Sequence, residues 1–235
     1  MAKKTENEVE TVAAVEATEE TTKEEKETKK TKAKKEDEPL NYEEIIKTSL
    51  KKTEREGIDD LIAFMDEVGF FTAPCSGGNH LCKEGGLAEH SCNVMLTAEK
   101  MSVVLLKGEN ITPEIRNSIV IAALLHDLGK VGDYGKAMYV ENILKSGKRS
   151  DAKPFMRNKG LSNVPHAIRS IKLATLFIDL TEDEEWAILT HDGLYDFMKY
   201  EMQGHETKLS MLIHWADMWS SKVIETESEG DVDGE

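Results

Sequence analysis

The amino-acid sequence predicts an all-α domain, a bundle of about seven or eight helices with a disordered tail at each end. Between residues 40 and 224, apolar residues recur at the three- and four-residue spacing of a helix face, and glycines and capping residues separate the segments. No segment shows the alternation of apolar and polar residues typical of a half-buried strand, and none is repeated. Helices with one apolar face each pack around a shared core.

The two ends of the chain lack the apolar residues that a core needs. Residues 1–39 consist mostly of Lys, Glu, Thr and Ala, without Leu, Ile or any aromatic residue. Such a segment buries too little apolar surface to offset the entropy lost on ordering, so we expect it to be disordered. Residues 225–235 carry six acidic residues and no basic one, and we expect an acidic disordered tail. The expected domain therefore spans residues 40–224.

The charge of the domain restricts its partners. The whole chain has a net charge of −15, of which −6 belongs to residues 40–224. This balance argues against tight binding to duplex nucleic acid, which depends on cations that neutralise phosphates. No apolar run approaches the roughly 18 residues of a membrane helix, so we expect no membrane partner. Three cysteines, an odd number, do not suggest a disulfide framework, and we expect the reducing cytoplasm.

The first two helices are expected over residues 41–57 and 58–71, and a glycine stops each apolar pattern. Their apolar stripes hold Ile45, Ile46 and Leu50 in the first helix and Leu61, Ile62, Met65 and Val68 in the second. Residues 72–86 contain a proline, four glycines and a serine, so a loop should follow.

Two longer helices come next. The first is expected over residues 87–106. The second should begin at Thr112, a favourable N-cap, with Pro113 in the first helical position. Its apolar pattern continues to His126 and Asp127.

Residues 137–165 are mixed in character, and we expect a short helix and a long irregular connection there. Helices should follow over residues 166–180, over 181–193 with a threonine cap and an acidic first turn, and over 205–225. The inward face of the last helix is predicted to hold Leu209, Leu212, Ile213, Ala216 and Trp219.

Several histidines and aspartates fall at helix ends or on apolar faces, where they are costly to bury without partners. They are His90, His126, Asp127, His166, His191, His214 and Asp217. One such histidine is more often a hydrogen-bonded core residue than a ligand. The set indicates a metal site, because imidazole and carboxylate bind first-row divalent metals and facing helices of a bundle can project them inward.

His126 and Asp127 are adjacent, and neighbouring helical residues point about 100° apart. Two donors at such an angle can occupy neighbouring positions around an octahedral ion at a helix end. We expect Gly129 to let the backbone turn away from that ion.

Five blocks follow one another in order: "GGLAEHSCNV", "ALLHDLGK", "VPHAIRS", "AILTHDG" and "LIHWADMWSSK". Together they resemble the HD-domain metal-dependent phosphohydrolases over about residues 60–225. The branch they resemble most comprises small phage and prophage HD-domain proteins and the HD module of bacterial 3′–5′ exoribonucleases. The resemblance implies an HD-domain helical bundle in a bacterial cell, in a phage or prophage setting.

The resemblance implies that His90, His126, Asp127 and Asp217 are the metal ligands, and that His126, Asp127 and Lys130 are catalytic. Two imidazoles and two carboxylates leave room for water on a six-coordinate ion, which suits Mn²⁺, Fe²⁺, Co²⁺, Ni²⁺, Mg²⁺ or Zn²⁺. A metal of this kind lowers the pKa of a bound water and polarises a phosphoryl oxygen.

His166 and His191 stand where the family's pocket histidines hold a second metal or contact substrate phosphate. Lys130 and Arg169 are placed to pair with phosphate charge. For Lys130, a cation favoured at the C-terminus of a helix is an equally good explanation.

Two departures from the family pattern weaken the second-metal role and any transfer of a substrate. The block after His166 reads Ala-Ile-Arg-Ser where phage-like relatives have Gly-Glu-Lys-Ser. His191 is followed by Asp192 and a glycine, where the exoribonuclease module often has His-His-Gly. Asp192 is either an extra metal or water-positioning group or, more simply, an exposed residue at a helix end.

Other polar residues allow alternatives. Cys75, His80, Cys82 and Cys92 suggest a zinc site, but the sequence lacks the Cys-x-x-Cys pair of strong structural zinc sites, and we expect none. His80 either reaches the mouth of the site or lies on a surface loop. His214, three residues before Asp217, either orients a ligand or is a core histidine.

These observations predict an enzyme that hydrolyses a phosphate ester or anhydride of a small phosphorylated substrate, a nucleotide. A non-catalytic regulator of the same fold that binds a nucleotide or metal is the first alternative, but it would not need all four ligands. A 3′–5′ nuclease on single-stranded nucleic acid is the second. The acidic domain and the lack of a segment for a separate nucleic-acid-binding barrel count against it.

Overall fold

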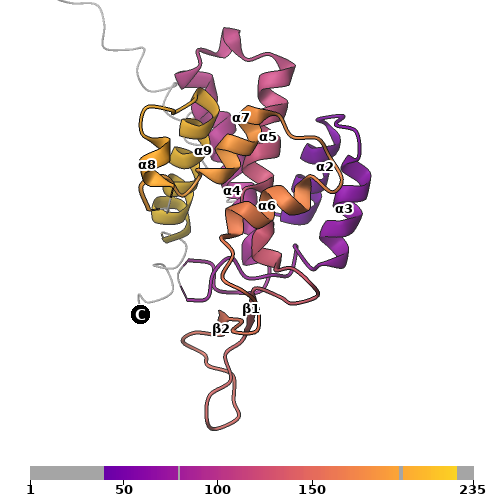
Figure 1. Cartoon of the computed structure of the whole chain (residues 1–235), viewed down its shortest axis with the longest axis vertical. Coiled ribbons are helices and arrows are strands. Elements are labelled where there is room, and N and C mark those ends of the chain that lie inside the picture. Colours follow the sequence, from indigo (N-terminus) through magenta and orange to yellow (C-terminus); the bar gives the residue numbers. More distant parts are fainter. Residues whose placement is uncertain (1–39, 79, 196–197, 227–235) are drawn as a thin grey trace, which may run out of the picture. The chain divides into compact units, whose positions relative to one another are not determined.

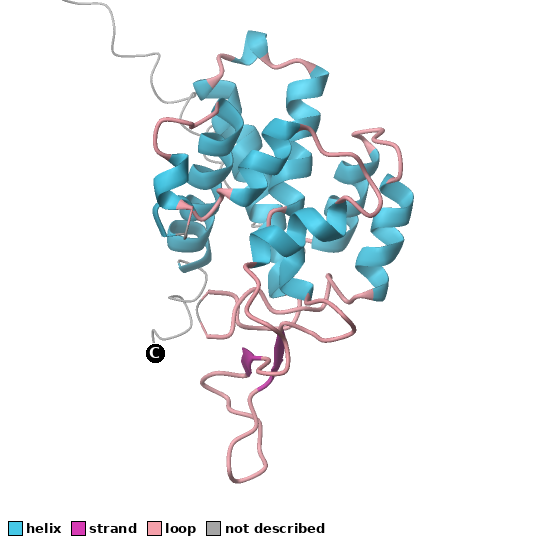
Figure 2. Ribbon diagram, in the orientation of Figure 1, coloured by secondary structure: helices cyan, strands magenta, loops and turns pink. Residues whose placement is uncertain are grey.

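The computed structural model describes residues 40–78, 80–195 and 198–226, and the tail predicted for residues 1–39 lies outside them. The described residues form a helical unit with one small hairpin, which confirms the predicted all-α class (Figures 1 and 2). No described helix is long and apolar enough to cross a membrane.

The first half of the unit contains four α-helices, labelled as in Figure 1. They are α2 (Tyr42–Lys51), α3 (Ile58–Glu67), α4 (Gly86–Leu105) and α5 (Pro113–Leu125). Short 3₁₀ turns η1 (Gly108–Asn110) and η2 (Leu128–Val131) follow α4 and α5. The predicted start of α5 is confirmed, because the Thr112 hydroxyl accepts a hydrogen bond from the backbone N–H of Ile115 and Pro113 is the first helical residue. The predicted loop before α4 is also present.

The second half contains α6 (His166–Ala174), α7 (Glu182–Leu189), η3 (Gly193–Tyr195), α8 (Lys199–Met202) and α9 (Lys208–Trp219). A π-helical turn, η4 (Ser220–Ile224), continues α9. The predicted threonine cap of α7 is confirmed at Thr181, which forms a capping box with Glu184. Thr207 and Ser210 form a second capping box at the start of α9.

Helix α4 is the long central element, and it packs against α2, α5, α9 and η4. Helix α7 in turn contacts α5, α6 and α9, and η2 packs on α6. The core between these helices is built from the predicted stripes. Its buried members include Ile46, Leu50, Leu61, Ile62, Met65, Leu209, Leu212, Ile213 and Ala216.

The helix expected within residues 137–165 is absent, and this prediction was wrong. Strand β1 (Tyr139–Glu141) pairs antiparallel with β2 (Phe155–Arg157), so that Tyr139 lies opposite Arg157 and Glu141 opposite Phe155. The hairpin extends away from the helices (Figure 1). Each strand has three residues, too few for an alternating pattern to stand out in the sequence.

Two further predictions need correction. Trp219 is not a core residue, because half of it is exposed. Glu225 is not part of a disordered tail, because it continues the helical backbone and is 1% exposed. The rest of the predicted C-terminal tail, residues 227–235, lies outside the described residues.

Candidate metal centre

Three helix ends bring the four predicted primary ligands together. His90 lies near the start of α4, His126 and Asp127 directly follow α5, and Asp217 lies near the end of α9. Nε2 of His90 is 3.1 Å from Oδ1 of Asp217 and 3.3 Å from Nε2 of His126. Nε2 of His126 is also 3.3 Å from Oδ2 of Asp127. His90, His126 and Asp217 thus form a group that could hold one metal ion, with Asp127 beside it.

A second group adjoins the first. His166 is the first residue of α6, and His191 and Asp192 follow α7. The Nε2 atoms of His166 and His191 are 3.0 Å apart, and Oδ2 of Asp192 is 3.4 Å from Nε2 of His166. His166, His191 and Asp192 also meet the geometry of a metal-binding group.

Asp127 lies between the two groups. Its Oδ2 faces His90 and His126, whereas its Oδ1 is 3.2 Å from Nε2 of His166 and 3.6 Å from Nε2 of His191. One carboxylate therefore presents a separate oxygen to each group. Burial favours the neutral acid, but Lys130 and His126 outweigh it and hold the pKa of Asp127 well below its ordinary value.

The buried imidazoles are oriented so that their Nε2 atoms point into the centre. Nδ1–H of His126 donates to the carbonyl of Ala123 at 2.8 Å, and Nδ1–H of His191 donates to that of Ile188 at 2.7 Å. A carbonyl oxygen only accepts, so it fixes the proton on Nδ1. This leaves the lone pair on Nε2, the arrangement that metal-ligating histidines adopt.

These donors fit a divalent cation. With its Nδ1 proton donated to a carbonyl, each of His126 and His191 directs an Nε2 lone pair into the centre. Oδ1 of Asp127 is buried and makes no hydrogen bond with the described residues. Buried acceptors without donors are costly, and a cation among them would satisfy them. Mixed nitrogen and oxygen donors suit first-row divalent metals.

Gly129 has a different role from the predicted one. Its φ angle is not in the positive range, so the turn itself does not demand glycine. A side chain there would instead collide with the carbonyl oxygen of His166 and come within 2.8 Å of the backbone nitrogen of Ser170. The Ser170 hydroxyl accepts from the Gly129 N–H and donates to the His126 carbonyl. Gly129 therefore lets α6 approach η2 closely enough to bring His166 to the centre.

The sequence did not reveal Glu225. Its Oε1 lies 2.9 Å from Nδ1 of His90 and 3.2 Å from Nδ2 of Asn93. Burial favours the neutral acid, but hydrogen bonding to His90 and the charge of that imidazole lower the pKa of Glu225. An ionised carboxylate only accepts, so Nδ1–H of His90 donates to it and Nε2 faces the metal centre. Its place in an acidic stretch at the end of the chain hid this role.

The two predicted phosphate-pairing cations differ. Nζ of Lys130 lies 2.6 Å from Oδ2 of Asp127, and its side chain lines the central cavity. Arg169 is 1% exposed, donates to the carbonyl of Ser162 and is not among the residues that line that cavity. Arg169 therefore does not share the cavity that Lys130 lines, because its guanidinium is enclosed by the fold.

Among the cysteine-rich residues, Cys75 and His80 reach the centre. Nε2 of His80 lies 3.4 Å from Sγ of Cys75 and 3.5 Å from Oε2 of Glu225. Burial lowers the pKa of His80 to about 4, so the ring is neutral at pH 7. Cys82 and Cys92 belong to no metal-binding group of the described residues.

His214 supports the second group from behind. It is buried, and its Nδ1–H donates to the carbonyl of His191 at 2.8 Å. Gly193, with a φ of 55°, packs directly against the His214 ring, where any side chain would collide. The His214 ring thus fixes the backbone that carries His191 and Asp192.

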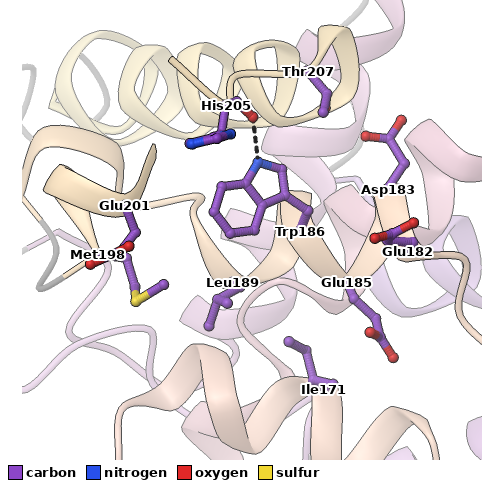
Figure 3. A pocket seen from close by; sticks show the side chains of 10 residues that line it. All are labelled: Ile171, Glu182, Asp183, Glu185, Trp186, Leu189, Met198, Glu201, His205 and Thr207. Atoms are coloured by element: carbon purple, nitrogen blue, oxygen red, sulfur yellow. Dashed lines mark hydrogen bonds between the residues drawn. The ribbon is translucent and has the colours of Figure 1, made fainter. Parts of the chain in front are cut away.

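The centre opens into a cavity of about 490 Å³. Its lining includes Asp127, Lys130, Tyr139, His166, Asp192 and Asp217. A larger cavity, of about 840 Å³, lies elsewhere, around Trp186 (Figure 3). Four carboxylates, Glu182, Asp183, Glu185 and Glu201, line it, with His205 at its edge. It holds none of the predicted site residues.

Comparison with known proteins gave one match. A family model described as HD domain matches residues 87–217, more than half of the chain. The matched segment begins three residues before His90 and ends on Asp217. No significant match was found among curated proteins or among solved structures.

Proposed function

This chain belongs to the HD domain family of the metal-dependent phosphohydrolase superfamily, and we propose that it hydrolyses a phosphate ester or anhydride of a nucleotide. The observation that carries the proposal is the set of buried and half-buried Nε2 atoms and carboxylate oxygens that converge from five helices or helix ends. The first divalent ion would be held by four of these groups, those of His90, His126, Asp127 and Asp217. The donors suit Mn, Fe, Co, Ni, Mg or Zn and do not choose among them.

A bound divalent ion supplies a Lewis acid that lowers the pKa of water and polarises a phosphoryl oxygen. The protein residues would place the substrate against it. The ammonium of Lys130 lines the cavity and would offset phosphate charge. His166 and His191 would either hold a second ion together with Oδ1 of Asp127 or contact the substrate phosphate. Asp192 stands 3.4 Å from His166 and would complete the second set.

The test is a hydrolysis screen with each candidate metal. Nucleoside mono-, di- and triphosphates, cyclic nucleotides and short oligonucleotides are offered to the wild-type protein and to the double variant His126→Ala/Asp127→Ala. The matched control is His205→Ala/Asp183→Ala, which removes the same two residue types from the other cavity (Figure 3). We expect activity in the wild type and control and a loss of at least a hundredfold in the first variant.

Two results would count against the proposal. Equal inactivity of all three proteins on every substrate would contradict an enzyme. Nucleotide binding by calorimetry without turnover would instead favour the regulator of the same fold. The β1–β2 hairpin beside the cavity is rich in basic residues, which favours the alternative of a nuclease. The oligonucleotides in the screen test that alternative.

We further propose that the protein works in a reducing compartment, the cytoplasm of a bacterial cell. The support is that all three cysteines are free thiols, with Cys75 and Cys92 buried. The phage or prophage setting has its support in the sequence resemblance alone. Mass spectrometry of the purified protein with and without thiol alkylation tests the free-thiol state.

A further inference from the structure

The β1–β2 hairpin has the opposite charge from the rest of the domain. Residues 136–159 carry seven basic and two acidic residues, a net charge of +5, within a domain whose net charge is −6. The basic residues are Lys136, Lys145, Lys148, Arg149, Lys153, Arg157 and Lys159, and all are exposed. Such a concentration of charge on an otherwise acidic domain attracts a polyanion to one place.

One face of the hairpin combines aromatic and basic side chains. Tyr139 and Arg157 are cross-strand partners, as are Glu141 and Phe155, and directly opposed residues point to the same face. The guanidinium of Arg149 lies 5.9 Å from the Phe155 ring centroid and 3.4 Å from Glu141. Both side chains of the Arg149–Glu141 ion pair are exposed, so the pair contributes little stability. Arg149 can therefore leave Glu141 and bind a phosphate at little cost in free energy. We call Tyr139, Arg149, Phe155 and Arg157 the hairpin strip.

The hairpin strip is continuous with the catalytic cavity. Tyr139 lines that cavity together with Lys130 and Ser76. The loop that carries Ser76 packs against the hairpin, because a side chain at Gly77 would meet the Tyr139 ring and one at Gly78 would meet the Lys153 ammonium. The loop of Ser76 thus joins the cavity, which Lys130 lines, to the hairpin, which carries Lys153, Arg157 and Arg149.

We propose that the hairpin strip binds a single-stranded nucleic acid whose terminal phosphate enters the catalytic cavity. This deepens the proposed function, because it names the substrate as an oligonucleotide. At about 3.3 Å per residue, the extended segment from β1 through Ile143, which bridges to Arg149, to Leu144 spans roughly 17 Å, longer than one nucleotide needs. Tyr139 and Phe155 are half-buried and lie among exposed cations. Aromatic rings among cations form the kind of surface on which unpaired bases stack while the backbone is neutralised.

A single strand fits this surface better than a duplex. Tyr139 and Phe155 can stack only on bases that are not paired within a helix. The acidic remainder of the domain would repel the second strand of a duplex. The cavity lined by Lys130 and Asp192 ends at the buried Asp127 and His191. The free end of a single strand can enter it.

The test measures binding without cleavage. Fluorescein-labelled oligomers of eight thymidines or eight uridines are titrated with the full chain in EDTA, and anisotropy is followed at several salt concentrations. The double variant Arg149→Gln/Arg157→Gln should bind at least tenfold more weakly at 100 mM salt. Its plot of log affinity against log salt should be flatter by about 1.4, since each lost phosphate contact removes about 0.7.

A matched variant controls for charge. Lys100→Gln/Lys107→Gln removes the same charge from the C-terminal end of α4, away from the cavity lining, and should bind like the wild type. Phe155→Leu should weaken binding at least fivefold, while Phe155→Tyr, which keeps a ring for stacking, should restore it. The thymidine and uridine arms separate DNA from RNA as the source of the strand.

Each outcome has a definite meaning. The proposal is overturned if the hairpin variants bind like the control, if no oligomer binds at low salt, or if a duplex binds as tightly as a single strand. Hydrolysis of a mononucleotide without oligomer binding would overturn the hairpin proposal and leave the proposed function standing. Oligomer binding at the hairpin without hydrolysis of any substrate would overturn the proposed function and leave the hairpin proposal standing.

Discussion

At the scale of single residues, the contact between His90 and Glu225 joins the centre to the last described turn of the chain. The two residues are 135 positions apart, and both are 1% exposed. A carboxylate that accepts the Nδ1 proton fixes the ring orientation and raises the basicity of Nε2. Glu225 is thus a positioning residue that acts through His90.

We expect Glu225→Ala to weaken binding of Mn²⁺ about 10- to 100-fold, the usual effect of losing such a partner. Glu225→Gln keeps an acceptor oxygen for Nδ1–H and should lose less. Isothermal titration of the metal-free protein measures both. A chain that ends at Thr226 should bind like the wild type, whereas one that ends at Ile224 should bind like Glu225→Ala. Equal affinity for the two truncated chains would contradict this role.

The same scale shows what the sequence could and could not reveal about the site. His90, His126, Asp127 and Asp217 stand out because polar ligands interrupt apolar helices, and the structure brings all four together. The burial of Arg169 could not be predicted, because a basic residue near a predicted ligand says nothing about whether its side chain is enclosed. Glu225 was missed because an acidic residue in an acidic segment carries no signal, and only the three-dimensional contact distinguishes it.

At the scale of elements, an ion pair joins the turn after α2 to the start of α7. The two guanidinium nitrogens of Arg55 lie 3.0 and 2.7 Å from the two carboxylate oxygens of Glu184. The Glu184 side chain is fully buried, and it also accepts from the backbone N–H of Thr181 in the capping box. Burial raises the pKa of Glu184, but the hydrogen bonds from Arg55 and Thr181 outweigh it and hold the pKa below 4.5.

We therefore expect Arg55→Met to lower the free energy of unfolding by about 3 kcal/mol at pH 7, since it leaves a buried carboxylate without its cation. The loss should depend on pH. A lowered folded-state pKa gives stabilisation that is complete above the ordinary value of 4.5 and disappears as the pH falls through the lowered pKa. Urea unfolding from pH 7 to pH 3 should show the difference from the wild type shrinking below about pH 4.5.

The control for this prediction is Lys51→Met, which breaks the exposed pair of Lys51 with Asp59. Exposed pairs contribute about 0–1 kcal/mol, so the effect should be small at every pH. A difference for Arg55→Met that stays constant down to pH 3 would show that lost packing, rather than the unpaired carboxylate, causes the destabilisation.

The sequence predicted the helices well because each helix contains its own capping residues and its own apolar spacing. Thr112 with Pro113, and Thr181 with its acidic first turn, mark helix starts that the structure confirms. The hairpin could not be predicted in this way, since its strands are stabilised by each other and by the loop at Gly77 and Gly78. The exposure of Trp219 could not be predicted either. Helical spacing shows which residues share a face of the helix, but not whether another element packs on that face.

At the scale of the whole described unit, the candidate centre links helices that are distant in sequence. Its candidate ligands come from α4, the ends of α5 and α7, the start of α6, and α9. Unfolding separates these elements and abolishes the site, so metal binds only the folded state. A ligand of this kind stabilises the fold by mass action, by about 2.7 kcal/mol when its concentration is a hundred times its dissociation constant.

We therefore expect removal of metal by EDTA to lower the melting temperature by about 5–10 °C, because a domain of this size loses roughly 2–4 °C per kcal/mol. Differential scanning calorimetry of the metal-loaded and chelated protein measures the shift. The variant His126→Ala/Asp127→Ala lacks two of the proposed primary ligands, so its melting temperature should not respond to metal or to EDTA. His205→Ala/Asp183→Ala should respond as the wild type does, because its changes lie in the other cavity. An unchanged melting temperature, together with no metal in elemental analysis of the purified protein, would mean that the converging histidines and carboxylates are held by hydrogen bonds and protons alone.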